Sequence, residues 1–279
     1  MHLAAMNSPS LPFRFCNTVR PRPYLVLLFL CCFGVLTPAG TIFAEDLTRG
    51  QPVQLKRTLE QLLGAEEAER YAKVLAPDKE ITWEVYLPNN DAAEPPGVLV
   101  YVSPFNEGRI QGAWRPVMDR YNLVFIGANK SGNRIQGNRR LLMALMGLKA
   151  LEPHILVDST RISVSGFSGG GRVASILASQ FPDVFSGALY ICGVNFWQES
   201  LNPRVEQLVK NRFVFLTGSK DFNRDETRNV YQRYLDGGAR HSKLMIIPGM
   251  GHELPDKASM AEAMEFIYRA TESPEAIRD

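Results

Sequence analysis

The sequence predicts an α/β protein in which helices cover both faces of a mostly parallel central sheet, without a large lid domain. Apolar runs such as Val98–Val102 and Leu123–Ala128 are continuous, as in strands buried on both faces of a parallel sheet. Segments with helical periodicity lie between such runs, and alternation of strands and helices favours this architecture. The connection between Cys192 and Phe213 is too short to form a large lid domain.

The elements are expected in the following order along the chain. Leu59, Leu62 and Leu63 recur at helical spacing among charged residues, and they predict a helix over residues 54–75. Residues 81–88 (ITWEVYLP) alternate in polarity and predict a half-buried strand. Six more apolar runs predict strands at Val98–Val102, Leu123–Ala128, Arg161–Ser165, Gly187–Cys192, Phe213–Gly218 and Lys243–Gly249. Further helices are expected at Arg139–Leu151, Gly170–Phe181, Asp225–Leu235 and Lys257–Ala270.

The first 44 residues differ from the rest of the chain. They contain three arginines, an apolar run at Tyr24–Leu36 and then a stretch of small residues that ends in charge. This order predicts a secretory signal peptide over residues 1–44, cleaved after Ala44 or, as second choice, after Ala39. A membrane span needs about 20 apolar residues, so an uncleaved membrane anchor is only the alternative. We therefore expect a secreted or periplasmic protein with a single domain over residues 45–279 and a core over about residues 80–271.

Composition and charge exclude several partners. The net charge of +2 becomes −1 once the three arginines of the signal are removed, so the mature domain is near neutral. A nucleic-acid surface would need clustered Lys and Arg, and neither nucleic acid nor a stable membrane partner is expected after cleavage. Cys192 is the only cysteine outside the signal, and its apolar surroundings predict a buried structural thiol. No metal and no cofactor are expected.

A G-x-S-x-G pattern occurs at residues 166–170 (GFSGG), between a predicted strand and a predicted helix. This is the setting of a nucleophile elbow, a tight turn that presents its serine at the edge of the sheet. Glycines at 166 and 170 would avoid a clash between Cβ atoms across the turn, and the following helix N-terminus would favour negative charge. A phosphate loop would need a Gly-Lys-Ser/Thr ending, which is missing, and a plain turn is the remaining alternative. We predict that Ser168 is a nucleophile.

An elbow serine needs a base and an acid that orients the base, in the chain order Ser, Asp/Glu, His. His252 follows the last predicted strand at its carboxyl end, where ligands bind in such sheets, whereas His241 precedes that strand. Asp221 follows the neighbouring strand and is the predicted acid. Its rival is Asp225, which fits the first turn of a helix that begins with a capping box at residues 223–226.

Two backbone N–H groups are expected to form an oxyanion hole. One belongs to Gly169, which follows the nucleophile, and the other to the loop after Val98–Val102. Pro104 in that loop has no N–H, so Phe105 is the predicted second donor.

Aromatic and amide side chains near the ends of strands are candidates for substrate binding. Phe196 and Trp197 follow a strand and either line the site or pack under a loop. Asn129 and Asn133 follow another strand and either face the site or form a turn.

Residues 81–270 resemble the α/β-hydrolase superfamily. The resemblance rests on the segments VLVYVSP, DSTRISVSGFSGGGRVAS, FVFLTGSKD and PGMGH. The elbow segment looks most like that of secreted esterases of the polyhydroxybutyrate depolymerase and feruloyl esterase type. This resemblance implies Ser168 as nucleophile, Asp221 as acid and His252 as base. Many relatives carry His-Gly where this chain has Ser103-Pro104, so the resemblance leaves the second oxyanion donor open.

These features predict a serine hydrolase that cleaves small or polymeric carboxylic esters through an acyl-enzyme intermediate. A serine peptidase or an acyltransferase with the same triad is the alternative enzyme, although a peptidase would usually carry a domain that gates the substrate. A non-catalytic binding protein with the hydrolase fold is a third interpretation. Such proteins usually lose a triad residue, and all three candidates are present here.

Overall fold

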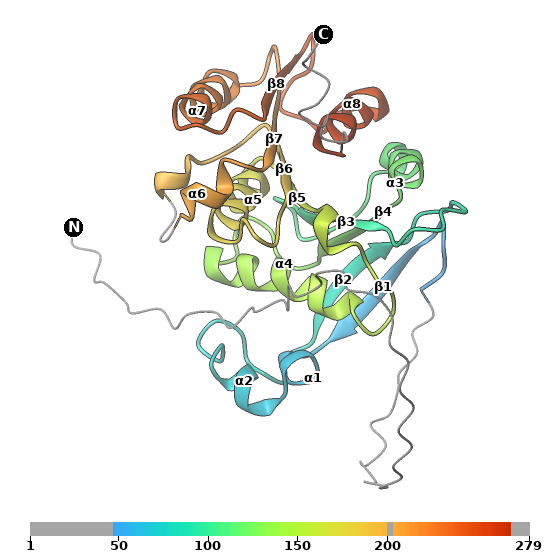
Figure 1. Cartoon of the computed structure of the whole chain (residues 1–279). Coiled ribbons are helices and arrows are strands. Elements are labelled where there is room, and N and C mark those ends of the chain that lie inside the picture. The colour runs from blue at the N-terminus through green and yellow to red at the C-terminus, as the bar shows by residue number, and fades with distance from the viewer. Residues whose placement is uncertain (1–46, 200–202, 269–279) are drawn as a thin grey trace, which may run out of the picture. The chain divides into compact units, whose positions relative to one another are not determined.

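An eight-stranded sheet forms the centre of the protein in a computed structural model that describes residues 47–199 and 203–268 (Figure 1). These residues belong to one compact unit, Ala44–Asp279, and the predicted signal peptide lies outside the described residues. The strands are β1 (Pro52–Arg57), β2 (Ile81–Tyr86), β3 (Gly97–Val102), β4 (Leu123–Ala128), β5 (Ile162–Phe167), β6 (Gly187–Ile191), β7 (Arg212–Gly218) and β8 (Ser242–Ile247). Their order across the sheet is β1-β2-β4-β3-β5-β6-β7-β8.

The sheet is parallel over most of its width. β2 pairs antiparallel with β1 and with β4, whereas all pairs from β4–β3 to β7–β8 are parallel. Parallel strands end at the same edge of a sheet, so the loops after β3, β5, β6, β7 and β8 emerge on one side. This arrangement confirms the predicted fold class.

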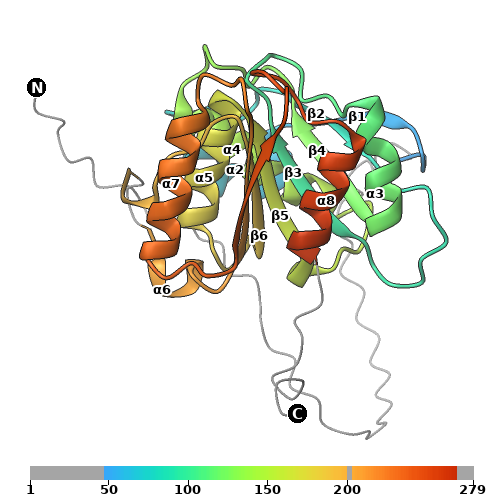
Figure 2. The same ribbon diagram turned by 90° about the horizontal axis from the view of Figure 1, so that it is seen from above.

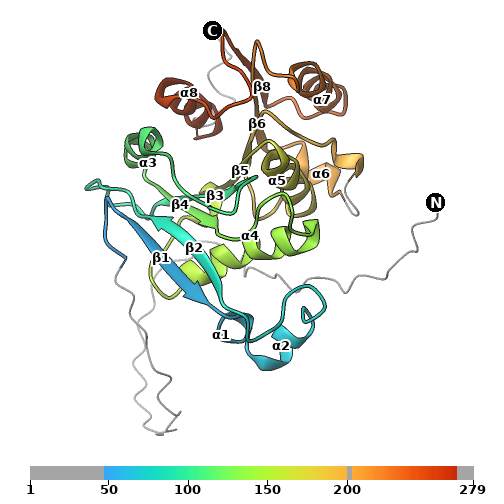
Figure 3. The same ribbon diagram turned by 180° about the vertical axis from the view of Figure 1, so that it is seen from behind.

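Helices cover both faces of this sheet. They are α1 (Leu59–Leu63), α2 (Ala65–Glu69), α3 (Arg115–Tyr121), α4 (Gly137–Leu151), α5 (Gly169–Gln180), α6 (Val205–Leu208), α7 (Arg224–Asp236) and α8 (Lys257–Tyr268). Figure 2 shows α4, α5 and α7 along one face and α3 and α8 along the other. The short helices α1 and α2 lie at the β1 end of the sheet, and α7 and α8 lie at the β8 end (Figure 3). None of the helices in the described part of the chain combines the length and apolar character needed to cross a bilayer.

The helix predicted over residues 54–75 is wrong in its first part. Pro52–Arg57 form β1, which pairs with β2 along its whole length, and Leu55 is its buried residue. The helical leucines begin only after Thr58, which caps α1, and Gly64 then separates α1 from α2 with a φ of 80°. The helical spacing of the leucines correctly predicts α1 but not the residues before α1, because pairing with β2 decides the conformation of those residues.

Helix α3 was not predicted from the sequence, although its residues show a helical pattern. Trp114, Val117, Met118 and Tyr121 recur at the spacing of one helix face, and the first three are fully buried. Pro116 stands near the start of the helix, where proline is tolerated. Trp114 also donates a hydrogen bond from Nε1 to the carbonyl of Pro255 at 3.0 Å, which anchors the segment that follows β8.

Candidate active site

Ser168 lies at the turn between β5 and α5, at the carboxyl edge of the sheet. Its φ of 54° and ψ of −122° are a combination that residues other than glycine rarely adopt. Its N–H donates to the carbonyl of Ile191 on β6 at 2.7 Å, which fixes the turn against the neighbouring strand. The described structure therefore has the strained strand–turn–helix geometry of a nucleophile elbow at the predicted position.

Gly166 and Gly170 allow this turn, but the atoms that a Cβ on each residue would meet differ in part from those predicted. A Cβ atom on Gly166 would lie 2.3 Å from the carbonyl carbon of Gly170, across the turn as expected. A Cβ atom on Gly170 would instead lie 1.9 Å from the carbonyl oxygen of Val102, at the end of β3. The predicted clash of one Cβ with the other is thus corrected to two separate clashes with backbone. The elbow packs so closely on β3 that only glycine fits at residue 170.

His252 connects Ser168 to a carboxylate. Its Nε2 atom lies 2.9 Å from Ser168 Oγ, and its Nδ1 atom lies 2.8 Å from Asp221 Oδ1. A carboxylate only accepts hydrogen bonds, so the Nδ1–H group of the neutral imidazole donates to Asp221. Nε2 then accepts from the Ser168 hydroxyl, which is the arrangement required for a base that removes this proton.

Asp221 is buried, with 5% of its surface exposed, and it is held on both carboxylate oxygens. Oδ2 accepts from Thr217 Oγ1 at 2.6 Å, and Oδ1 accepts from the backbone N–H of Asn223 at 3.0 Å. Burial alone would raise the pKa of Asp221, but the hydrogen bonds from Thr217, Asn223 and His252 outweigh it and lower the pKa below its ordinary value. The carboxylate is therefore charged near neutral pH and can stabilise a protonated His252.

The rival carboxylate lies elsewhere. Asp225 is in the first turn of α7, exposed, and it forms an ion pair with Arg224 at 3.0 Å. The predicted capping box at residues 223–226 is wrong, because the Asn223 side chain does not cap the helix. Its Nδ2 atom donates instead to the carbonyl of Cys192 at 2.8 Å, and this contact ties the loop that carries Asp221 to the loop after β6.

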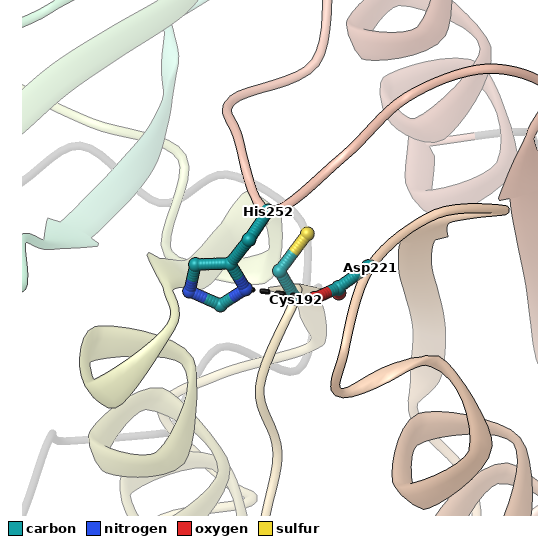
Figure 4. Close-up of side chains that lie close together, drawn as sticks. All are labelled: Cys192, Asp221 and His252. Carbon is teal, nitrogen blue, oxygen red and sulfur yellow. Dashed lines mark hydrogen bonds and ion pairs between the residues drawn. The ribbon is translucent and has the colours of Figure 1, made fainter.

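Cys192 lies beside the acid, in the loop after β6 (Figure 4). Burial and, to a smaller extent, the neighbouring Asp221 carboxylate together raise the pKa of its thiol to about 12. The ligand atoms of Cys192, Asp221 and His252 lie within 4.8 Å of one another, a spacing that could hold a metal ion. However, His252 Nδ1 already donates to Asp221 Oδ1 at 2.8 Å, and the Cys192 thiol donates to the carbonyl of Glu253 at 3.6 Å. The cluster is therefore better suited to hydrogen bonding than to metal binding.

The two segments predicted to form an oxyanion hole meet at the elbow, where a Cβ atom on Gly170 would lie 1.9 Å from the carbonyl oxygen of Val102 at the end of β3. Gly169 begins α5, where the free N–H groups of the helix N-terminus face the elbow. The N–H of Phe105 donates to the hydroxyl of Ser103 at 3.1 Å, inside its own loop. An oxyanion would therefore have to share or replace this hydrogen bond if Phe105 is the second donor.

Asn129 does not face the site, and this prediction is corrected. Its Nδ2 atom donates to Gln54 Oε1 at 2.7 Å, and its Oδ1 atom accepts from the N–H of Gly108 at 2.9 Å. The amide thus joins the loop after β4 to Gln54 on β1 and to Gly108 in the loop after β3. Asn133 is the amide beside the elbow, because a Cβ atom on Gly169 would lie 2.2 Å from Asn133 Oδ1.

Phe196 and Trp197 do not line the site either. They are packed in the interior, which was the alternative expectation for them. They are 6% and 4% exposed, respectively. Their rings pack against Tyr234 of α7 at centroid distances of 5.8 and 4.4 Å, and the Arg233 guanidinium lies 3.8 Å from the Phe196 centroid. Gly237 leaves room for the Trp197 ring, since a Cβ there would lie 2.3 Å from it.

Phe222 was not predicted from the sequence, although its ring lies closer to His252 than that of Phe167 does. Its ring stacks on His252 with centroids 4.1 Å apart, yet 77% of the residue is exposed. Phe167 lies 5.0 Å from the same imidazole. The signal for Phe222 was its position directly after Asp221, in a loop where a large apolar side chain has no core to enter.

Comparisons with known proteins show the fold. No family model and no curated protein matches the chain. Among solved structures, a ferulic acid esterase aligns with a TM-score of 0.55 at 18% identity, over 78% of this chain and 98% of that one. A thermophilic carboxylesterase cloned from a metagenomic library gives 0.54 at 15% identity, over 78% and 84%. An S-formylglutathione hydrolase from Staphylococcus aureus gives 0.53 at 14% identity, over 77% and 96%.

These neighbours have the α/β-hydrolase fold, and so does this chain. The predicted fold class is therefore confirmed. The narrower resemblance to polyhydroxybutyrate depolymerases and feruloyl esterases stays a prediction, since identities this low carry no information on substrate.

Proposed function

We propose that the protein hydrolyses carboxylic esters, with Ser168 as nucleophile, His252 as general base and Asp221 as the acid that orients it. One observation carries this proposal: the continuous hydrogen-bonded chain from Ser168 Oγ through both imidazole nitrogens to Asp221, with steps of 2.9 and 2.8 Å. The strained backbone of Ser168 supports it, because such strain is typical of functional sites.

In the acylation step, Ser168 Oγ attacks the carbonyl carbon of the ester while His252 Nε2 takes the hydroxyl proton. The carbonyl oxygen becomes an oxyanion, for which the N–H of Gly169 is the proposed first donor. The C–O bond to the alcohol then breaks, and His252 returns the proton to the leaving alkoxide. The products of this half-reaction are the free alcohol and an acyl ester on Ser168.

In the deacylation step, a water molecule takes the place of the alcohol. His252 removes a proton from this water as the water oxygen attacks the acyl carbon, and the bond from that carbon to Ser168 Oγ breaks. His252 then returns the proton to Ser168, and the carboxylic acid leaves. Throughout both steps Asp221 keeps the Nδ1–H tautomer and stabilises the imidazolium.

Exposed aromatic side chains support an ester with an apolar acyl or alcohol group. The large hydrophobic residues that are exposed in the described structure are Phe105, Leu156 and Phe222. Phe222 stacks on His252, and Phe105 lies 6.5 Å from the ring of Phe167, which contacts the same imidazole. An apolar group of the substrate would cover these rings and gain free energy from their burial.

The segment before the described residues supports a second proposal, which concerns location. We infer that residues 1–44 direct export, because they carry arginines, an apolar run and small residues in the order of a signal peptide. Amino-terminal sequencing of the protein recovered outside the cytoplasm tests this. A first residue near Glu45 is expected, whereas an intact N-terminus in the membrane fraction would favour the anchor.

The proposed activity is tested by hydrolysis of p-nitrophenyl acetate and butyrate by the purified protein, beside a Ser168→Ala variant. We expect turnover and labelling by a fluorophosphonate probe in the wild type, and a loss of about 10⁵-fold or more in kcat in the variant. A p-nitroanilide substrate run in parallel distinguishes an esterase from a peptidase. A folded wild type that neither turns over ester nor takes the label would favour a non-catalytic binding protein instead.

A further inference from the structure

A buried arginine joins the loop after β3 to the first residue of α5, which directly follows Ser168. Arg140, near the start of α4, has 5% of its surface exposed. Its Nη2 atom donates to the carbonyl of Ser103 at 2.9 Å, and its Nη1 atom donates to the carbonyl of Gly169 at 3.3 Å. Ser103 opens the loop after β3, and Gly169 directly follows the proposed nucleophile. These are the same two segments that carry the proposed oxyanion donors.

This cation has no anionic partner in the part of the chain that the structure describes. Its hydrogen bonds go to backbone carbonyls, and its Nε atom is buried without a partner there. Burial lowers the pKa of the guanidinium, but an arginine remains charged at neutral pH. Burying a charge without an opposite charge costs free energy, and a neutral amide could bond a carbonyl at lower cost. A full positive charge is useful at this place only if negative charge forms close to it.

The helix that carries Arg140 holds it rigidly. Met143, Ala144 and Gly147 lie on the same stripe of α4 and are buried. Trp83 donates from Nε1 to the carbonyl of Met143 at 2.8 Å, which fixes this part of the helix to β2. An arginine on the buried stripe of a helix was visible in the sequence, but without the structure nothing showed what it contacts.

We propose that Arg140 is a positioning residue for the oxyanion hole, in a site that works as described under the proposed function. By holding the carbonyls of Ser103 and Gly169, the guanidinium sets the orientation of the two segments whose N–H groups receive the oxyanion. Its charge also favours the oxyanion over the neutral ester. Arg140 acts through the backbone and does not touch the substrate.

The experiment compares Arg140→Met and Arg140→Lys with Arg139→Met as matched control. Arg139 is the preceding residue on α4 and bonds neither Ser103 nor Gly169 through its side chain. For each protein we would measure the melting temperature and count active sites by fluorophosphonate titration. We would then measure kcat per titrated site and the Ki of an aryl trifluoromethyl ketone, whose adduct with the serine carries an oxyanion. Normalising to titrated sites removes the effect of any protein that has not folded.

We expect Arg140→Met to lower kcat per site about 10- to 100-fold and to raise the Ki of the ketone by a similar factor, with little change in KM. Arg140→Lys should recover part of both losses, because it keeps the charge and one hydrogen bond. Arg139→Met should match the wild type. A role in folding alone would lower the melting temperature and the number of active sites but leave kcat per site and Ki unchanged, and that result would overturn the proposal.

Two further outcomes are separated by the same experiment. If Arg140→Met does not fold, Arg140→Lys is compared with Arg140→Gln, which keeps a donor but no charge. Equal kcat per site in these two variants and the wild type would overturn the proposal, whereas the order wild type, Lys, Gln supports it. A wild type that takes no fluorophosphonate label contradicts the proposed function itself, while a labelled and active wild type with unaffected Arg140 variants contradicts only the role of Arg140.

Discussion

His252 Nε2 lies 2.9 Å from Ser168 Oγ although the two residues are 84 positions apart in the chain. The order of the strands explains this contact. Ser168 follows β5 and His252 comes after β8, and the strands between them in the sheet, β6 and β7, are followed by Cys192 and Asp221. Four neighbouring parallel strands thus deliver these four side chains to one edge of the sheet, although the residues are far apart in the sequence.

The acid of the site can be identified by two carboxylate substitutions. Asp221→Asn should lower kcat about 10³- to 10⁴-fold, because an amide in this place no longer fixes the Nδ1–H tautomer or stabilises the imidazolium. Steady-state hydrolysis of p-nitrophenyl butyrate measures the effect.

Asp225→Asn is the matched control for that substitution. Asp225 is exposed and forms an ion pair with the partly exposed Arg224, so kcat should stay within about twofold of the wild type. A large loss in Asp225→Asn together with an active Asp221→Asn would reverse the assignment.

The sequence predicted the parallel part of the sheet and the positions of Ser168, Asp221 and His252 because each of these depends on a local pattern. A continuous apolar run is recognisable in the sequence as a buried parallel strand. A polar residue directly after such a strand lies at the carboxyl edge of the sheet, where the candidate site is. Residues 54–57 were wrongly predicted as helix, since the pairing of β1 with β2 outweighs the helical spacing that begins with the leucines of α1.

Which side chains face the site could not be predicted from the sequence, because the orientation of a side chain depends on contacts with residues that are distant in the chain. Asn129 is held by Gln54, and Trp197 packs against Tyr234, neither of which is near it in the sequence. Arg140 was not predicted as part of the site for the same reason, since its partners are Ser103 in the loop after β3 and Gly169 at the start of α5.

Thr217→Val should reduce the stability of the protein at neutral pH. Val has nearly the same shape, but it removes the Thr217 hydroxyl that donates to the buried Asp221 carboxylate at 2.6 Å. A hydrogen bond to a charged group contributes about 1.5–3 kcal/mol, and we expect a loss of this size in urea unfolding at pH 7. Thr227→Val is the control: Thr227 is equally buried, but its hydroxyl has no partner among the described residues, so its removal should be neutral or stabilising.

The loss in Thr217→Val should also depend on pH. The pKa of Asp221 is lower in the folded protein than in the unfolded chain, so its ionisation stabilises the fold above the unfolded pKa of about 3.9. This contribution is lost as the pH falls through the lower, folded-state pKa. Because the variant raises that pKa toward the unfolded value, the difference in unfolding free energy between the two proteins should shrink below about pH 4. A difference that stays constant from pH 7 to pH 3 would show that Asp221 is not the group involved.

Gly170→Ala should disrupt the elbow. Its Cβ atom would lie 1.9 Å from the backbone oxygen of Val102, and neither the strand nor the helix can move without displacing Ser168. We expect a loss of about 3–5 kcal/mol in unfolding free energy or failure to fold, measured by urea denaturation. Gly137→Ala at the start of α4 meets nothing within 4 Å and should be neutral or stabilise by about 0.5–1 kcal/mol. Equal stability of the two variants would mean that the elbow does not pack on β3 as described.

The thiol of Cys192 should be nearly inert in the folded protein. Cys192 is fully buried, and its pKa of about 12 leaves almost no thiolate at pH 8, so alkylation by iodoacetamide should be about 10³-fold slower than in urea. Mass spectrometry of the peptide that contains Cys192 measures both rates. Asp221→Asn should speed the reaction in the folded state, because removal of the neighbouring charge lowers the pKa of the thiol. Fast labelling of the folded wild type would mean that the thiol is exposed or ionised. This result would contradict the buried, protonated thiol beside Asp221.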